Sequence, residues 1–405
     1  MPPPTREHLL DRSPFAERLN GLLAHAWARG WCEDPPLTAE ALWAKASRGF
    51  QHADEAGGRS ADEVEDFRTR LERLTDSIRG DADLNPLGRT IAHGQLVRVI
   101  RQRLALGRLW RARPHLLDTQ LAPPIIVVGQ MRSGTTRLHR LLSADPRFSS
   151  TRFCDSWLPV PSRVDLRRWQ GAGALWFARL LNPWLDTLHP FGSARADEEL
   201  GWLAAALDHC AYEAQWRIPA FTAWSEARGA LPVYREFARI LATDAAHRRN
   251  AALPRVLKVP QFSEDLAELL QVFPTARVIR CQRDAEAVVT SAVSLCANQM
   301  AMQSDSISVP ELEREARRKL ALREARTNAA LARFAGRVAT AGFDALQRDW
   351  RGSIAAIYRT LGLEVTPAAW AAMERECAAA ASDPHHHHRQ DLQRLAPRRL
   401  DPSLS

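Results

Sequence analysis

One stretch constrains the fold more than any other: an apolar strand runs into a Gly, Ser and Thr turn, and the turn leads directly into a helix. Residues 124–142 read PIIVVGQMRSGTTRLHRLL. Residues 125–128 are apolar and mostly β-branched, as expected of a strand buried on both faces of a parallel sheet. Leucines follow at helical spacing. The unpaired backbone N–H groups of the first helical turn, from Gly134 to Thr136, therefore predict a site for an anion.

This turn departs from a Walker A loop, G-x-x-x-x-G-K-[ST], because Thr135 stands where the lysine belongs. The nearest cation is Arg132, within the loop. A terminal phosphate carries about two charges, which a lysine and a metal neutralise, whereas a sulfuryl group carries one. The loop therefore favours a sulfuryl donor. The alternative is a tight turn without a ligand, since Gly, Ser and Thr are ordinary turn residues.

A second set of motifs lies further along the chain. Residues 255–259 and 276–281 are apolar strands, and the helix between them is expected to be capped by Ser263 and ended by Pro274, which gives a right-handed βαβ unit. Arg283 follows the second strand, and Ser291 lies eight positions later, about 9 Å along the next helix. These two side chains could hold one phosphate. Alternatively, they are a surface arginine and a tolerated helix serine.

The RSGTT loop and the R-D-x-x-x-x-x-x-S pair resemble, in order and separation, the nucleotide-binding motifs of the sulfotransferases that use 3′-phosphoadenosine 5′-phosphosulfate (PAPS). The segments LLSADPRF, HPFGSARADEE, LKVP and YRTLGL resemble bacterial members of the tyrosylprotein sulfotransferase type. The resemblance implies metal-free, in-line transfer of the sulfuryl group from PAPS to a hydroxyl or amine of an acceptor. It assigns the 5′-phosphosulfate to Arg132, Ser133, Gly134, Thr135 and Thr136, and the 3′-phosphate to Arg283 and Ser291.

Lys258 is a candidate catalytic residue. It is one of only three lysines in the chain, and it interrupts a strand that is otherwise apolar. A buried ammonium is costly unless it faces an anion. Together with Arg132, it is expected to stabilise the charge that develops on the oxygen between sulfur and phosphorus.

The base that takes the acceptor proton is harder to assign. The resemblance implies a carboxylate that precedes a P-x-P element, and alignment on residues 159–161 puts Asp155 in that place. Asp155 could equally cap a turn or the start of a helix. His189, Glu198 and Glu199 are the other candidates, with a loop histidine and a solvated acidic helix start as their structural alternatives.

The helical periodicity predicts a fold in two parts. Residues 1–120 are expected to form an all-helical extension, and the resemblance implies that residues 121–405 form a sulfotransferase domain with a helical C-terminal part. The domain should have the three-layer α/β fold of the P-loop NTPases, with four or five parallel strands and helices on both faces. The helices expected in the extension cover residues 9–28, 38–51, 61–79 and 87–113.

Composition narrows the partners and the compartment. The net charge of +8 suits an anionic cofactor, but it is dispersed, so no nucleic-acid partner is expected. The six cysteines lack C-x-x-C spacing, which indicates reduced thiols. No apolar stretch is long enough for a signal or a membrane span. We therefore expect a cytoplasmic protein without a transmembrane segment.

Two further features concern the ligands. Seven tryptophans lie between the cofactor motifs and are expected to contribute to a cleft for a small-molecule, carbohydrate or lipid acceptor. The tract from His385 to His388 is too local to predict a metal site. The resemblance implies instead a loop over the nucleotide, which residues 388–392 match loosely.

Two other functions remain open from the sequence. A metal-dependent small-molecule kinase or NTPase would use the same fold, but Thr135 replaces its lysine and no acidic strand end for magnesium is evident. A nucleotide-binding module without catalysis is the third possibility.

Overall fold

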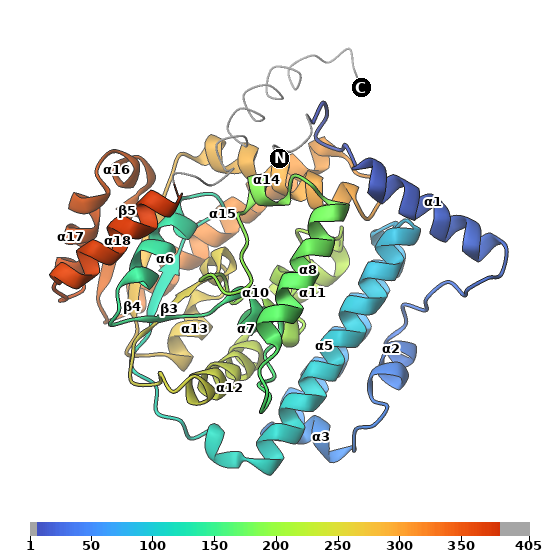
Figure 1. Cartoon of the computed structure of the whole chain (residues 1–405), viewed down its shortest axis with the longest axis horizontal. Helices are drawn as coiled ribbons and strands as arrows, with labels where there is room; N and C mark the ends of the chain where they lie inside the picture. The colour runs from blue at the N-terminus through green and yellow to red at the C-terminus, as the bar shows by residue number, and fades with distance from the viewer. Residues whose placement is uncertain (1–5, 381–405) are drawn as a thin grey trace.

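The computed structural model describes residues 6–380 and contains a sheet of five strands, all parallel, in the order β2-β3-β1-β4-β5 (Figure 1). The strands are β1 (Ile125–Val128), β2 (Ser149–Ser150), β3 (Arg255–Lys258), β4 (Arg277–Gln282) and β5 (Val338–Gly342). The register pairs Ile126 with Leu257 on one side and with Val278 on the other. The predicted parallel sheet is confirmed, and the sequence analysis had not located β2 and β5.

Alternate residues of the central strand enter two different cores, which makes the domain three-layered. Ile125 and Val127 pack in one core with α6 (Thr135–Ala144), α17 (Trp350–Thr360) and α18 (Pro367–Ala380). Ile126 and Val128 face the opposite core, which the N-terminal and middle helices share. The strand is fully buried because both of its faces are covered.

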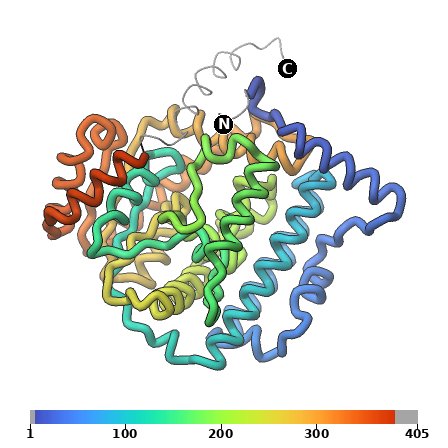
Figure 2. Tube along the Cα trace, in the orientation of Figure 1, coloured from blue at the N-terminus to red at the C-terminus, as the bar shows by residue number. Residues whose placement is uncertain are grey.

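The N-terminal helices are built on strong start signals, because a Ser, Thr or Asn side chain caps four of them. They are α1 (Pro14–Ala28), α2 (Ala39–Ala46), α3 (Ala53–Ala56), α4 (Ala61–Asp81) and α5 (Pro86–Ala112). Apolar residues of α2, α4 and α5 lie in the same core as one face of the sheet. Figure 2 shows these helices on one side of the molecule and the C-terminal helices on the other. The domain boundary near residue 120 stays a prediction.

The helices between β2 and β3 surround the region next to the phosphate loop. They are α7 (Phe153–Trp157), α8 (Arg167–Leu181), α9 (Leu185–Leu188), α10 (Leu200–Ala205), α11 (Pro219–Glu226) and α12 (Leu231–His247). After β3 come α13 (Leu266–Val272), α14 (Ala285–Ala301), α15 (Val309–Arg333) and α16 (Phe343–Arg348). Short 3₁₀ turns cover Pro114–Leu116, His209–Ala211 and Pro260–Ser263. None of the helices in the described chain combines the length and the apolar character that a membrane span requires.

Ser263 does not have the predicted role of helix cap. It ends a 3₁₀ turn, and α13 begins only at Leu266. Its hydroxyl instead accepts a hydrogen bond of 3.0 Å from the backbone N–H of Gly129, the first residue after β1. Ser263 therefore supports the start of the phosphate loop from the turn that follows the neighbouring strand β3.

A buried cluster of charges attaches α15 to the rest of the molecule. The ammonium of Lys319 lies 2.6 Å from a carboxylate oxygen of Glu226 and 3.0 Å from one of Glu264. Arg323 contacts Glu264 as well, at 3.1 Å, and His209 lies 2.7 Å from the other oxygen of Glu264. Every cation in this α15 cluster faces a carboxylate of the chain itself.

Candidate active site

The phosphate loop connects β1 to α6 and has a strained backbone. Gly134, the residue before α6, has a φ of 89°, and a Cβ added there would lie 2.9 Å from the ring of Phe343. Arg132 has a φ of 68° although it carries a side chain, a conformation that is uncommon outside glycine. Among the described residues, no side chain caps the N-terminus of α6. The first-turn N–H groups are therefore oriented as an anion site requires.

The structure brings Arg132, Arg283 and Ser291 together, although about half the domain separates them in sequence. Arg132 Nε donates to Ser291 Oγ at 2.8 Å, and Arg283 Nη1 donates to the carbonyl oxygen of Arg132 at 2.6 Å. Arg283 also lies over the ring of Phe343, 4.0 Å from its centroid. Burial, and after it the charge of Arg283, lowers the pKa of Arg132 to about 10, so the Arg132 guanidinium is charged at neutral pH.

Lys258 ends β3 directly beside the phosphate loop. Its side chain is fully buried, and its ammonium donates to Thr136 Oγ1 at 3.1 Å and pairs with Glu198. The sequence analysis predicted that this buried lysine faces an anion. In the described structure the anion it contacts is the Glu198 carboxylate, while Thr136 connects it to the first turn of α6.

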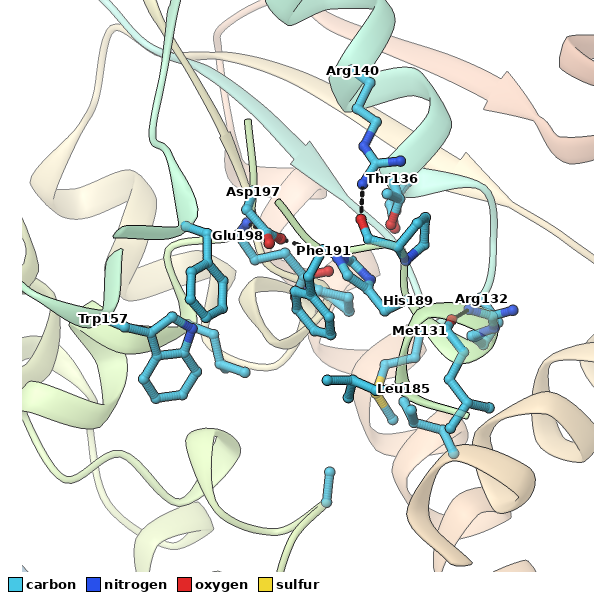
Figure 3. A pocket seen from close by; sticks show the side chains of 18 of the residues that line it. Met131, Arg132, Thr136, Arg140, Trp157, Leu185, His189, Phe191, Asp197 and Glu198 are labelled. Atoms are coloured by element: carbon cyan, nitrogen blue, oxygen red, sulfur yellow. Dashed lines mark hydrogen bonds and ion pairs between the residues drawn. The ribbon is translucent and has the colours of Figure 1, made fainter. Parts of the chain in front are cut away.

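The segment from His189 to Glu199 brings a histidine and two carboxyl groups to the loop (Figure 3). His189 Nε2 lies 3.1 Å from Asp197 Oδ1. Burial opposes ionisation of Asp197, but the charge and hydrogen bond of His189 hold the pKa of that carboxyl below its ordinary value. Backbone hydrogen bonds from Phe153 to Arg195 and from Asp197 to Thr151 fix the segment against α7.

Glu199 points away from this group. It is fully buried, and one of its oxygens accepts a 2.9 Å hydrogen bond from the backbone N–H of Lys258. Burial raises the pKa of Glu199 to about 7. Its contact with the backbone of β3 is structural, and the residue does not line the cavity described below.

Asp155 is placed differently from the expectation for a catalytic base. Its side chain is fully buried and faces three guanidinium groups: Arg152 at 2.6 Å, Arg167 at 3.3 Å and Arg248 at 3.5 Å. Burial alone would raise its pKa, but the hydrogen bond from Arg152 and the charge of Arg167 hold the pKa below its ordinary value. Because Asp155 is absent from the residues lining the cavity, this geometry argues against its predicted role.

A cavity of about 1230 Å³ joins the phosphate loop to the middle helices. At one end it is lined by Arg132, Gly134, Thr135, Thr136, Arg283 and Ser291, and at the other mainly by apolar residues such as Phe153, Trp157, Leu175, Leu188 and Phe191. Figure 3 shows His189, Asp197 and Glu198 between these two ends. Gln95 and Arg98 of α5 also reach the cavity. The sequence analysis missed both, because nothing in the local pattern of a helix indicates which cavity it will border.

The residues that line the cavity determine its charge and its capacity to bind a metal ion. Five arginines and three carboxylates line the cavity, which leaves an excess of positive charge: Arg98, Arg132, Arg137, Arg140, Arg283, Asp197, Glu198 and Glu376. His189, Asp197 and Glu198 offer possible metal ligands within 4.8 Å of one another. However, Asp197 binds His189 and Glu198 binds Lys258, so a cation there would have to displace both contacts.

A comparison with models of protein families identifies the family of this chain. Residues 123–367 match the model described as the sulfotransferase family, and this match spans more than half of the chain. The chain belongs to the sulfotransferase family. Members of this family are transferases with PAPS as the sulfuryl donor, and the uncapped helix and the excess of arginines suit that anionic nucleotide.

Solved structures resemble this sulfotransferase over nearly its whole length. Sulfotransferase STF1 from Mycobacterium tuberculosis H37Rv is 26% identical with a TM-score of 0.75, over 90% of this chain and 99% of that chain. Sulfotransferase STF9 from Mycobacterium avium is 20% identical with a TM-score of 0.76, over 87% of this chain and 90% of that chain, and supports the fold alone. No curated protein sequence matches this sulfotransferase significantly. The tract from His385 to His388 lies outside the described residues.

Proposed function

We propose that this sulfotransferase moves the sulfuryl group of PAPS to a hydroxyl or amine of an acceptor by in-line displacement, without a metal. Within the family, the arginine in its phosphate loop and the motifs described above support a relationship to the tyrosylprotein sulfotransferase type. One observation carries the proposal. The loop and the Arg283–Ser291 pair form one positively charged end of a cavity whose other end is apolar, and the buried ammonium of Lys258 contacts Thr136 of that charged end.

Different residues of the charged end would bind the two phosphate groups of the donor. Ser133 to Thr136 and the N-terminus of α6 would hold the 5′-phosphosulfate, and Arg283 with Ser291 would hold the 3′-phosphate. In the transfer, the bond between sulfur and the bridging oxygen breaks as the acceptor oxygen bonds to sulfur. The negative charge moves to the 5′-phosphate, where Lys258 and Arg132 stabilise it.

We assign the removal of the acceptor proton to His189 rather than to Asp155. His189 lines the cavity, and Asp197 binds one of its ring nitrogens, which is the geometry of an oriented general base. Glu198 also lines the cavity, but its charge is already matched by Lys258. We therefore give Glu198 the role of counter-ion, which keeps the buried ammonium of Lys258 compensated when no donor is bound.

A thermal melt tests the donor assignment. The protein should be stabilised by 3′,5′-adenosine bisphosphate in the presence of a chelator, by about 2.7 kcal/mol at 100 times the dissociation constant. ATP with magnesium should stabilise it little, because Thr135 replaces the lysine of a Walker A loop. A preference for ATP with magnesium would instead support the kinase or NTPase alternative.

Three variants test the base. His189→Gln should lower turnover of a phenolic surrogate by about 10² to 10⁴ while binding of 3′,5′-adenosine bisphosphate is retained. Glu198→Gln should have a smaller effect on turnover. Asp155→Asn should lower the melting temperature instead, because it leaves buried arginines without their carboxylate. Turnover retained in His189→Gln and lost in Glu198→Gln would move the base to Glu198.

A further inference from the structure

Helix α8 has two apolar faces, and only one of them is used. Gly171, Ala174, Leu175 and Ala178 lie on the side that borders the acceptor end of the cavity. With 3.6 residues per turn, residues 169, 173, 176, 177 and 180 fall on the opposite side of the same helix. The helix packs against α1, α7 and α9, and Figure 1 shows it at the surface of the molecule.

The outer face of α8 is exposed to an unusual degree. The exposed fractions are 73% for Trp169, 64% for Trp176, 46% for Phe177 and 40% for Leu180. Six of the ten exposed large apolar side chains of the described chain lie between residues 164 and 180. Single exposed apolar residues are ordinary, whereas a contiguous group on one helix indicates an interaction surface.

Among the described residues, the unmatched charges beside this face are both positive. Arg163 and Arg168 are exposed and form no ion pair with any described residue. The two acidic residues nearby are already matched, since Asp165 lies 2.9 Å from Arg167 and Asp186 lies 2.7 Å from Arg179. An apolar stripe of Trp, Phe and Leu flanked by arginines complements the boundary between acyl chains and anionic headgroups.

We propose that the outer face of α8, formed by Trp169, Trp176, Phe177 and Leu180, docks on the surface of an anionic lipid membrane. Helix α8, whose inner face borders the acceptor end of the cavity, would then hold that end close to the bilayer surface, and the acceptor would be an amphiphile that carries its hydroxyl or amine on a headgroup. Only this statement about the acceptor rests on the proposed function. The membrane contact itself does not depend on the chemistry of the cavity.

Cosedimentation of the full chain with vesicles tests the surface. The vesicles contain phosphatidylcholine either alone or with about 30% phosphatidylglycerol. The wild type should bind the anionic vesicles at least about tenfold more tightly, because the attraction of arginines to the membrane surface depends on anionic lipid. Trp169→Ser with Trp176→Ser should weaken this binding about tenfold or more. Arg163→Glu with Arg168→Glu should remove the preference for the anionic vesicles.

Trp31→Ser is the matched control. Trp31 is 72% exposed and follows the C-terminal end of α1, whereas Ser13 at the other end of α1 contacts Leu181 of α8. This control should bind vesicles like the wild type. The proposal is wrong if the wild type binds neither kind of vesicle, or if Trp31→Ser loses as much binding as the α8 variants. It is also wrong if the α8 variants instead convert a dimer of the free protein to a monomer, which would identify a second copy as the occupant.

A melt with 3′,5′-adenosine bisphosphate accompanies each variant. Unchanged stabilisation by the nucleotide shows that the α8 variants are folded and that lost vesicle binding is a surface effect. A wild type that binds vesicles but not the nucleotide would contradict the proposed function and leave the docking surface supported. A wild type that binds the nucleotide but not the vesicles would contradict the docking surface and leave the proposed function supported.

Discussion

The α15 cluster and the charged end of the cavity use the same residue types in opposite ways. In the α15 cluster, Lys319 and Arg323 each contact buried carboxylates, so the chain itself supplies the counter-charge. The cavity lining has five arginines and three carboxylates, and Lys258, which contacts the lining residue Thr136, has Glu198 as its anionic contact. Burial of a cation therefore does not by itself indicate function. What distinguishes the functional end is that its positive charge exceeds the negative charge that the fold provides.

The largest effect is expected in the α15 cluster. Lys319→Met would leave Glu226 and Glu264 without the ammonium between them, and removing one partner of a buried pair costs about 3 to 5 kcal/mol. Chemical denaturation should show this loss, while the affinity for 3′,5′-adenosine bisphosphate of the remaining folded protein stays unchanged. Lys45→Met is the matched control, because Lys45 contacts His93 rather than a carboxylate. A Lys319→Met protein with full stability would remove the distinction between the two regions.

At the cavity the corresponding substitution should act on turnover. Lys258→Met removes a cation that stabilises charge in the transition state, and losses of this kind are about 10² to 10³ in kcat. Its stability should change less than that of Lys319→Met, because the Glu198 side chain is 17% exposed and can be hydrated. The two quantities are measured on the same preparation. A large loss of stability with normal turnover per folded molecule would place Lys258 among the structural cations.

The next effect separates the two phosphates of the donor. Arg283→Ala should weaken 3′,5′-adenosine bisphosphate by about 1.5 to 3 kcal/mol, as expected for a charge-assisted hydrogen bond. It should weaken 5′-AMP much less, and calorimetry can measure both affinities. Arg314→Ala, at a side chain that is 72% exposed, is the control. Equal losses for both nucleotides would mean that Arg283 acts through its hydrogen bond to the Arg132 carbonyl instead.

The smallest effect concerns a carboxyl group whose pKa is raised by burial. An unfolded Glu199 ionises near its ordinary value of 4.5, but burial raises its folded pKa to about 7. The folded state binds more protons between these values, so this group should reduce stability by up to about 1.4 kcal/mol per unit as the pH rises through that window. Glu199→Gln should be more stable than wild type at pH 8 and similar at pH 4.5. Glu65→Gln, at an exposed residue, is the control and should follow the wild type at every pH.

The fold was predictable where the chain carries local patterns and obscure where it does not. The apolar strand β1 and the helix after the loop were evident from residue types alone. Strand β5 was not, because three of the five residues in its sequence VATAG are Ala or Gly, which are depleted in strands. β2 has only two residues, too few for a periodic signal.

The candidate site likewise contains residues that could be predicted from the sequence and residues that could not. The loop residues and Arg283 follow strands and Lys258 ends one, so their positions at one edge of the sheet could be inferred from sequence. The environment of Asp155 could not, since the arginines around it lie just before α7, at the start of α8 and just after α12. The pairing of His189 with Asp197, and their approach to Lys258, depends on how a loop folds against α7. Such tertiary contacts between distant segments leave no spacing in the sequence.

The core that the N-terminal helices share with the sheet has a consequence for how the chain folds during synthesis. Helices α2, α4 and α5 leave the ribosome first, but the apolar residues of β1, β3 and β4 that complete their core are made later. Contacts between segments so far apart in sequence slow folding and leave apolar surface exposed in the meantime. We therefore expect the nascent N-terminal third to need a chaperone's protection until β4 has emerged.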